Sequence, residues 1–375
     1  MSSSGKPYLS VVVPSRNDDH GGNTLRRMQV FFSGLLEQLE KHRIDAELVL
    51  VDWNPPAGRP LLRDAIKWPP GLKHCTIRNI VVPPEVHRKF DHGDKAPFHF
   101  AAANNCGIRR ARGEYILPAG IDLLYSDDLM AFIAGRNLKS DERYRVSRYD
   151  VDRNVVRYDT LPEQLDFCRE NVILVKAYKK KHAGKARNAF PELHTSACGD
   201  FQLMSRHYWH LLRGFREADI VDGHCDGVLS YASYAAGVKE VVLGEPLRLY
   251  HIDHDEKYTE RTREARFPLE NRLSFTSLPA PLNAWVRAAY RRLLTIFGYK
   301  TRTSTHGVPT LGFLEYRRLA KEMLRGKRSY ICNDEDWGLG QEKLEEHVIH
   351  RADWDREYEA PDKGGREGAD EPEKY

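Results

Sequence analysis

Apolar and polar positions at the start of the chain follow two periods in turn. Tyr8–Pro14 is apolar on both faces, which is typical of a parallel strand buried on both sides. A polar turn over Ser15–Asn23 follows, and Thr24–His42 then carries apolar residues at helical spacing. A second strand is predicted at Ala46–Val51, directly before Asp52. This order predicts the first half of a nucleotide-binding βαβ unit, here without a GxGxxG dinucleotide motif.

The alternation of strands and helices continues along the chain. Further strands are predicted at Thr76–Val82, Tyr115–Leu117, Ser196–Arg206, Lys239–Leu243 and Pro246–Asp255. Helices are predicted at Phe100–Arg112, Ser126–Asn137, Gln164–Arg169, Tyr208–Leu212, His224–Gly237, Leu282–Phe297 and Leu311–Leu324. The segment Pro84–His99 is expected to be a surface loop, and the irregular spacing of its histidines at 87, 92 and 99 favours loop surface over the alternative of zinc ligands. We therefore predict an α/β fold with a mostly parallel central sheet flanked by helices.

Composition narrows the class of protein. The 375 residues are 41% hydrophobic and 30% charged, which suits a globular protein with a large core. A net charge of +4 gives no case for nucleic acid as the main partner. The six cysteines form no CxxC pair, so we expect a reducing compartment and no disulfide framework. Without a signal-peptide core, or an apolar run near the ~20 residues that span a bilayer, the chain is expected to be cytoplasmic with no transmembrane segment.

Acidic residues follow several of the predicted strands. Asp52 ends the second strand, and Asp122 lies in the turn of ARGEYILPAGIDLLYSDDL. The last predicted strand ends in a cluster that begins at His251, and Asp226 begins a helix. Open α/β sheets bind ligands at the carboxyl ends of their strands, where a carboxylate suits a divalent cation with phosphates. For Asp122 a solvated turn residue is the alternative. Group transfer from a nucleoside diphosphate donor needs such residues. It also needs a separate carboxylate that deprotonates the acceptor hydroxyl.

The order of these segments resembles the GT-A glycosyltransferases, particularly family 2 and related inverting enzymes. The resemblance covers roughly residues 8–256. It is carried by LSVVVPSRN, VLVDWNPP, AAANNCGIRRARGEYILPAGID, ACGDFQLMSRHYWHLLRGFRE, HCDGVLSYASYAAGVKEVVL and LYHIDH. The motifs HGGN, DWNPP and NDEDWGL are together associated with a bacterial family-2-like subgroup of unsettled substrate. The resemblance implies a GT-A fold and transfer of a sugar from a nucleotide-sugar, with a UDP-sugar favoured, to a glycan or other hydroxyl acceptor.

The resemblance also implies roles for individual residues. Asp52 would bind the base or ribose of the donor. Asp122 matches the last acid of the DxD motif and would bind Mn²⁺ or Mg²⁺, and His251 would complete the metal site. Asp226 matches the second acid of the ED pair and would be the catalytic base.

Further residues are expected around the donor. Asn105 and Arg109 would contact the diphosphate or the sugar. Pro14, Arg16 and Asn17, at the end of the first strand, would line the nucleotide pocket.

Three positions depart from the family pattern. Gly120 replaces the first acid of DxD, Cys225 the first acid of ED, and Trp53 the second acid of the DDGS element. Metal affinity should fall with one acid left, because ligand charge dominates the binding of hard cations. His254, Asp253 or a water would compensate, and Trp53 would stack on a nucleobase.

Two other functions compete with an inverting, metal-dependent glycosyltransferase. A non-catalytic glycan or nucleotide-sugar binder is motivated by the acids missing at Gly120 and Cys225. A nucleotidyltransferase would be expected to carry a Gly-rich, basic loop after the first strand, and SRNDDHGGN has only one Arg.

The chain is predicted to divide into three parts. Residues 1–258 are expected to form the GT-A domain, with a nucleotide-binding half at about 8–138 and an acceptor half at about 139–258. Residues 259–354 are expected to form a C-terminal helical extension, and 355–375 a disordered acidic tail. The basic amphipathic helix at 282–297 is expected to pack on the domain or a partner, with contact to a membrane surface as the alternative. The oligomeric state is left open.

Overall fold

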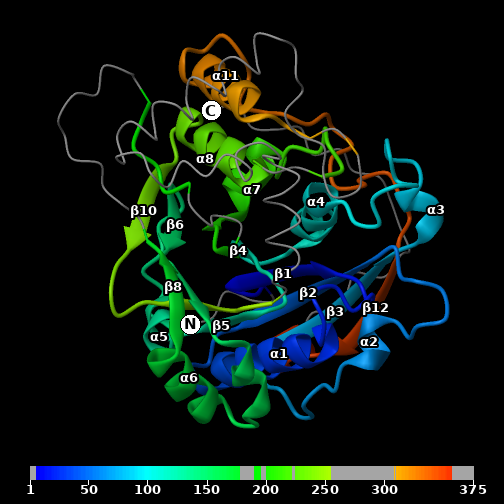
Figure 1. Cartoon of the computed structure of the whole chain (residues 1–375), viewed down its shortest axis with the longest axis vertical. Coiled ribbons are helices and arrows are strands. Elements are labelled where there is room, and N and C mark those ends of the chain that lie inside the picture. The colour runs from blue at the N-terminus through cyan, green and yellow to red at the C-terminus, as the bar shows by residue number, and fades with distance from the viewer. Residues whose placement is uncertain are drawn as a thin grey trace, which may run out of the picture.

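The largest element of the fold is an eight-stranded sheet with the order β10-β6-β9-β4-β1-β2-β3-β12 (Figure 1). The computed structural model describes residues 6–177, 190–195, 200–221, 224–254, 308 and 310–356. The strands of this sheet are β1 (Leu9–Ser15), β2 (Ala46–Trp53), β3 (Cys75–Val82), β4 (Tyr115–Pro118), β6 (Glu142–Val146), β9 (Leu203–Ser205), β10 (Lys239–Leu243) and β12 (Glu345–His350).

The middle of this sheet is parallel. β1 pairs in parallel with β2 and β4, and β2 pairs in parallel with β3. β6 and β10 are also parallel to each other, whereas β9 and β12 run antiparallel to their neighbours. At the end of β1, Ser15 lies opposite Asp52. Because parallel strands end at one edge, the turns after β1, β2 and β4 share a rim of the sheet.

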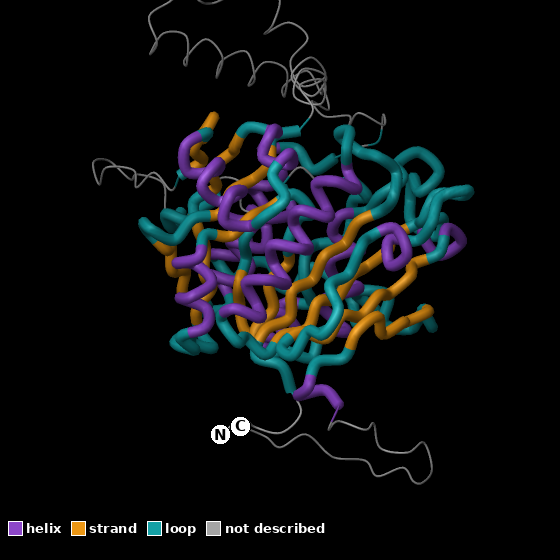
Figure 2. The backbone as a smooth tube through the Cα atoms, turned by 90° about the horizontal axis from the view of Figure 1, so that it is seen from below, coloured by secondary structure: helices purple, strands orange, loops and turns teal. Residues whose placement is uncertain are grey.

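Helices cover both faces of the sheet, which explains the apolar runs of β1 and β2 (Figures 1 and 2). Val11 and Val13 belong to the core that includes α1 (Thr24–Lys41), and Val12 to the core that includes α4 (Phe100–Arg110). The other helices are α2 (Leu62–Ala65), α3 (Pro84–His87), α5 (Asp127–Ala134), α6 (Leu161–Glu170), α7 (Arg206–Leu212), α8 (Cys225–Ala235), α11 (Phe313–Leu324), α12 (Asp353–Arg356) and the 3₁₀ helix Arg153–Arg157.

A second, four-stranded sheet positions the acid-bearing turn. Its order is β5-β11-β7-β8, with the strands β5 (Leu123–Tyr125), β11 (Leu249–Ile252), β7 (Arg148–Val151) and β8 (Val172–Lys176). β5 and β11 are antiparallel, and His251 lies opposite Leu123. Asp122 therefore lies between a strand of the central sheet and one of the small sheet, next to the end of β11.

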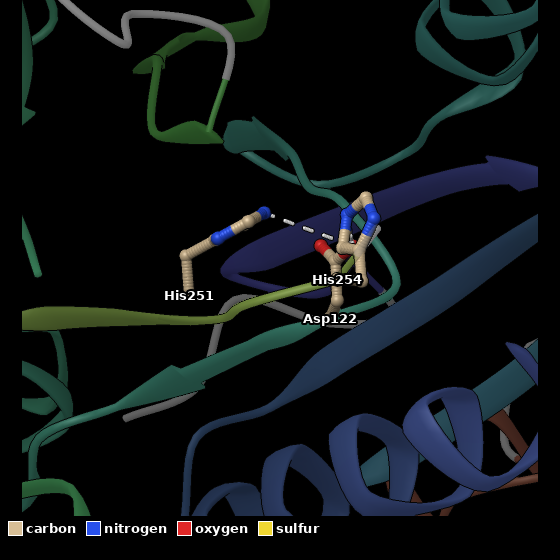
Figure 3. Close-up of side chains that lie close together, drawn as sticks. All are labelled: Asp122, His251 and His254. Carbon is tan, nitrogen blue, oxygen red and sulfur yellow. Dashed lines mark ion pairs between the residues drawn. The ribbon is translucent and has the colours of Figure 1, made fainter. Parts of the chain in front are cut away.

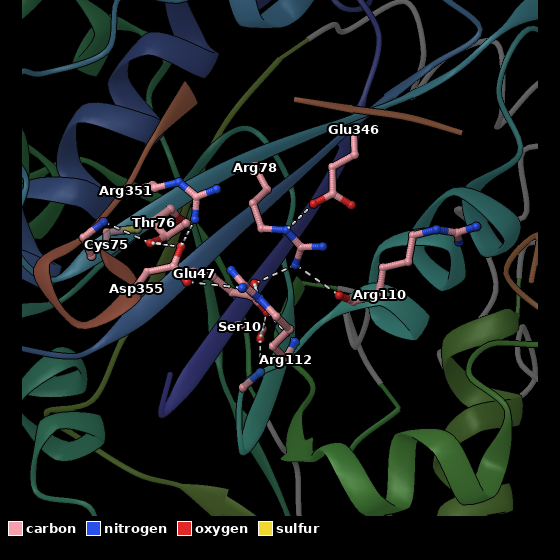
Figure 4. A network of polar contacts seen from close by, with 12 residues as sticks. Ser10, Glu47, Cys75, Thr76, Arg78, Arg110, Arg112, Glu346, Arg351 and Asp355 are labelled. Atoms are coloured by element: carbon pink, nitrogen blue, oxygen red, sulfur yellow. Dashed lines mark hydrogen bonds and ion pairs between the residues drawn. The ribbon is translucent and has the colours of Figure 1, made fainter. Parts of the chain in front are cut away.

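The C-terminal part of the chain returns to the central sheet. β12 pairs antiparallel with β3, and the Asp355 carboxylate of α12 is 1% exposed. It accepts hydrogen bonds from Thr76 and Arg112 in a polar network that also contains Glu47 (Figure 4). The segment predicted as a helical extension includes the strand β12, and α12 extends to Arg356. Residues 357–375 and the predicted helix 282–297 lie outside the described residues.

The predicted fold class is confirmed, because the central sheet is large, mostly parallel and flanked by helices. Five strands (β5, β6, β7, β8 and β12) were not predicted. β6 has the sequence ERYRV and β12 has EEHVIH. Their charged residues interrupt the alternation of apolar and polar positions from which a strand is predicted. In the described part of the chain, no helix combines the length and the apolar composition needed to cross a membrane.

Candidate functional site

Three side chains with metal-ligating atoms meet where the two sheets join. Asp122 lies in the turn between β4 and β5, His251 on β11, and His254 two residues after that strand. The backbone N–H of Ile252 donates to the carbonyl of Asp122 at 2.9 Å and so fixes the turn against β11. In Figure 3 the two imidazoles lie on either side of the Asp122 carboxylate.

The spacing of these atoms suits one cation. Nε2 of His254 lies 2.8 Å from Oδ2 of Asp122, and Nε2 of His251 lies 3.8 Å from the same oxygen. One ligand atom from each residue lies within 4.8 Å of the other two. Ligands about 2.1 Å from an octahedral ion are about 3 Å apart at a right angle. The mixed oxygen and imidazole set suits a transition ion such as Mn²⁺ better than Mg²⁺, which prefers oxygen ligands.

Asp150 orients one of the two imidazoles. Its Oδ1 lies 3.0 Å from Nδ1 of His251, which leaves Nε2 of that ring toward Asp122. Burial alone would raise the pKa of Asp150, but its close contacts with His251, Arg148 and Lys176 outweigh burial and lower the pKa. An ionised carboxylate behind a histidine is the usual second partner of a metal-bound imidazole.

Asp122 is also held ionised by its surroundings. Nη1 of Arg27 donates to Oδ2 of Asp122 at 3.2 Å, and both side chains are largely buried. Burial would raise the pKa of Asp122, but the charges of His251, His254 and Arg27 together lower it well below its ordinary range. Asp122 is therefore a carboxylate anion at any pH near neutral.

The loop after β1 forms one wall of this cluster. Gly21 has φ +73°, and a Cβ on it would lie 2.8 Å from Nδ1 of His254 and 3.0 Å from Nη2 of Arg27. Only glycine leaves room there for both side chains. The first glycine of the HGGN segment, Gly21, is thus explained by the close approach of this loop to the end of β11.

The same loop also borders Asp52. Oδ2 of Asp52 accepts a hydrogen bond from the N–H of Leu62 at 2.7 Å, and Nδ2 of Asn17 donates to the carbonyl of Pro60 at 3.0 Å. Oδ1 of Asp52 and Oδ1 of Asn17 are buried and have no hydrogen-bond partner among the described residues. Two unsatisfied acceptors at a strand end are a reason to expect a ligand with N–H or O–H donors.

Pro14 and Arg16 frame this position. Pro14 pairs with Val51 inside the sheet, and Arg16 donates to the carbonyl of Asn54 and to Asp18. Both therefore lie next to the strand-end position of Asp52.

Asp52 predicts a pH dependence of nucleotide binding. Burial raises the pKa of Asp52 to about 6. If the ionised carboxylate of Asp52 accepts hydrogen bonds from N–H or O–H groups of UDP, the affinity for UDP is full above pH 6. It then falls about tenfold for each pH unit below that value. Isothermal titration calorimetry with UDP between pH 5 and 8 measures this. A flat profile over that range would rule out Asp52 as an ionised contact.

Asp52→Asn separates binding from folding. A buried acid with a raised pKa loses stability as the pH rises from its unfolded value, about 3.9, through its folded value. Above pH 7 the substitution should therefore increase the free energy of unfolding by about 2–3 kcal/mol. It should also weaken UDP binding and remove its pH dependence.

Asn105 and Arg109 have their polar atoms engaged by the protein itself. Nδ2 of Asn105 donates to the carbonyl of Phe215 and to Glu217, and its Oδ1 accepts from the N–H of Phe215, all at 2.7 Å. Arg109 donates to the carbonyls of Glu335 and Trp337. Both residues fasten later segments to α4, and we leave them out of the proposed donor site.

The NDEDWGL motif also takes part in these contacts between α4 and later segments of the chain. Asn333 donates to the carbonyls of Arg213 and Phe215, and the N–H of Gly338 donates to Glu217. A Cβ on Gly338 would lie 2.5 Å from the carbonyl oxygen of Asn105. The motif therefore binds this C-terminal segment closely to α4.

Asp226 lies apart from the three-residue cluster. It occupies the first turn of α8, half-buried, with Sγ of Cys225 3.5 Å from its Oδ1. Tyr316 of α11 covers this end of the helix, since a Cβ on Gly227 would lie 2.7 Å from its hydroxyl, and its ring stacks on His224 at 4.7 Å. The structure brings Asp122 and His251 together, and Asp226 is not part of that group.

The predictions for Trp53, His87 and His99 were wrong, whereas His92 is exposed as predicted. Trp53 is fully buried, and its indole N–H donates to Nδ1 of His87 at 2.9 Å. Phe90 and His99 pack around it, and both histidines are 1% exposed. Trp53 is thus a core residue and has no free face for a nucleobase.

Sequence reasoning missed Arg27 and Asp150 and did not commit to His254. Arg27 is a charged residue within a helix, and nothing in the sequence around it indicates that it is buried. Asp150 lies on β7, a strand that was not predicted. Of the three compensating ligands considered, His254 joins the cluster, whereas Asp253 lies 3.6 Å from Arg153.

Comparisons with known proteins show distant structural similarity. No family model matches the chain, and no curated protein matches it. The structure of S. aureus TarS 1–349 in complex with UDP-GlcNAc is 11% identical, with a TM-score of 0.39, over 67% of this chain and 60% of that one. GalNAc-T7 with UDP, GalNAc and Mn²⁺ is 14% identical, with a TM-score of 0.42, over 68% of this chain and 45% of that one.

The catalytic domain of Drosophila β1,4-galactosyltransferase 7 in complex with xylobiose is 12% identical, with a TM-score of 0.32, over 63% of this chain and 65% of that one. The chain thus spans less than two thirds of each of these three structures. One fold accompanies many functions, so similarity at this level does not determine the function of this chain.

Proposed function

We propose that this protein is a glycosyltransferase that transfers a sugar from a nucleotide-sugar to an acceptor hydroxyl with inversion and with a divalent cation. One observation carries the proposal: Asp122, His251 and His254 lie close enough together at the carboxyl edge of the sheet to hold one cation. The loop that borders this cluster at Gly21 begins directly after β1, whose last residue lies opposite Asp52. A nucleoside diphosphate spans such a pair of positions, with its base at one and its phosphates at the other.

The chain's own residues have separate tasks in this proposal. Asp52 and Asn17 would accept hydrogen bonds from N–H or O–H groups of the base or ribose. Asp122, His251 and His254 would hold Mn²⁺, which supplies positive charge to a diphosphate leaving group. Asp226 would take the proton of the acceptor hydroxyl, which then attacks the sugar carbon from the face opposite the diphosphate.

The decisive experiment is turnover of UDP-sugars, with Asp226→Asn as the diagnostic variant. We expect Mn²⁺-dependent release of UDP from a UDP-sugar, measured with a coupled UDP assay across a donor panel. Removal of a general base costs about 10²–10⁴-fold in rate. Asp226→Asn should therefore lower kcat at least about 100-fold and leave the calorimetric affinity for UDP unchanged.

A matched variant controls for the helix position of Asp226. Asp128 is an exposed acid in the first turn of α5, as Asp226 is in the first turn of α8. Asp128→Asn should leave kcat unchanged, because an N-terminal acid that only favours the helix dipole has no part in the reaction. Equal loss in both variants would remove Asp226 from the role of base.

A second function has one observation in its favour. Gly120 and Cys225 stand where the resemblance expects acids, which suits a protein that binds a nucleotide-sugar or glycan without turning it over. Such a binder would show calorimetric affinity for UDP-sugars and no release of UDP under any condition of the same panel.

A further inference from the structure

We propose that Arg27 makes cation binding at Asp122 conditional on a nucleoside diphosphate, so that the free protein binds the metal weakly. This inference rests on the proposed function, and it adds to that site a residue and a coupling between the binding of the cation and of the diphosphate. It follows from the position of a buried guanidinium among the candidate metal ligands.

Hydrogen bonds hold the guanidinium of Arg27 next to Asp122, where a metal cation would bind. It lies in the first turn of α1 and is 3% exposed. Its Nη1 donates to Oδ2 of Asp122 at 3.2 Å, and its Nη2 donates to the carbonyl of His20 and to Oγ1 of Thr24. The guanidinium therefore contacts the same carboxylate oxygen that lies nearest to both imidazoles.

The charges of the site explain why the metal alone would bind weakly. Asp122 is the carboxylate of the three-residue cluster, and Gly120 adds no second one. Asp150 lies behind His251 and is already paired with Arg148 and Lys176. Arg27 thus balances the charge of Asp122, and an added divalent cation meets a neutral site with a fixed positive charge beside it.

A diphosphate reverses this balance. It brings negative charge and oxygen ligands, which hard cations prefer. The fork of an arginine also matches phosphate oxygens, so Arg27 can turn from Oδ2 of Asp122 toward the diphosphate without leaving its anchor on α1. Cation and diphosphate then stabilise each other, and by linkage each raises the affinity for the other by the same factor.

The test measures Mn²⁺ affinity by the electron paramagnetic resonance signal of free Mn²⁺, with and without UDP. In the wild-type protein UDP should tighten Mn²⁺ binding at least about tenfold, within the range of typical coupling between sites. Arg27→Gln should tighten Mn²⁺ binding in the absence of UDP and reduce the effect of UDP to about twofold or less. Arg27→Lys keeps the charge and should retain most of the coupling.

Arg26→Gln is the matched control. Arg26 is the neighbouring residue of α1, with its side chain 43% exposed and directed to Asp159 and the carbonyl of Val156. Its substitution should change neither affinity. Circular dichroism and urea unfolding confirm that each variant is folded, and Arg27→Met provides a second neutral variant with a better apolar fit.

The outcomes distinguish this inference from the proposed function. If Mn²⁺ and UDP bind with coupling but neither neutral Arg27 variant changes it, the role of Arg27 is wrong and the metal site stands. If Mn²⁺ binds the wild type equally well with and without UDP, the inference is also overturned. If no form of the protein binds Mn²⁺ under either condition, the metal site of the proposed function fails and the inference fails with it.

Discussion

Replacing Asp122 with alanine is expected to weaken Mn²⁺ binding in the presence of UDP by more than about 100-fold. Asp122 supplies the charged ligand of the cluster, and ligand charge sets the affinity for hard cations. Loss of a residue that merely supports a metal ligand costs about 10–100-fold, so loss of the carboxylate should cost more. Calorimetric titration of UDP with and without Mn²⁺ measures the effect, and the metal dependence of UDP binding should disappear.

Asp253→Ala is the control for this substitution. Asp253 lies between the two histidines in sequence, but its side chain is 43% exposed and 3.6 Å from Arg153. Its loss should leave Mn²⁺-dependent UDP binding within about twofold of the wild type. Retention of metal-dependent binding in Asp122→Ala would place the cation elsewhere and would remove the observation on which the proposed function rests.

Replacing Glu47 with glutamine is expected to lower the free energy of unfolding by about 3–5 kcal/mol, the usual cost of removing one partner from a buried ion pair. Glu47 is fully buried. Its carboxylate accepts from Ser10 at 2.6 Å, from Arg78 at 2.7 Å and from Arg112 at 3.0 Å (Figure 4). The network ties β1, β2 and β3 to the segment before β4 and to α12. Urea unfolding followed by fluorescence measures the loss.

Glu37→Gln controls for the change of side chain. Glu37 is exposed on α1, and its substitution should change stability by less than about 0.5 kcal/mol. Burial would raise the pKa of Glu47, but Arg78 and Arg112 outweigh it and lower the pKa. The contribution of Glu47 is therefore present above its unfolded pKa and is lost as the pH falls through its folded value. A variant as stable as the wild type at pH 7 would show that the network is dispensable.

The sequence predicted the elements that have a clear period. The strands at β1, β2 and β3 and the helices α1, α4, α8 and α11 lie within a few residues of their predicted bounds. Each has apolar residues at a spacing that depends only on local geometry. The strands that were missed, such as β6 and β12, have charged side chains that are paired within the fold. Glu346 on β12, for example, binds Arg78 at 2.7 Å.

For the site, local motifs identified Asp122, His251 and Asp52 as candidates, because each ends or follows a strand. They also suggested Asn105 and Arg109, whose partners come from far along the chain. Asn105 binds Glu217, 112 residues later, and Arg109 binds the carbonyl of Trp337, 228 residues later. No local pattern in a single sequence indicates such a partner.

The sequence by itself therefore determined the α/β class, the order of the main elements and the acids at the strand ends, because strand and helix periods are short-range properties. The tertiary structure alone decided what surrounds those acids. It placed Arg27 and His254 against Asp122, set Asp150 behind His251, and added β12 to the edge of the sheet. The physical reason is that charge balance and burial arise only when distant segments meet, and these two properties govern whether Asp122 can hold a cation.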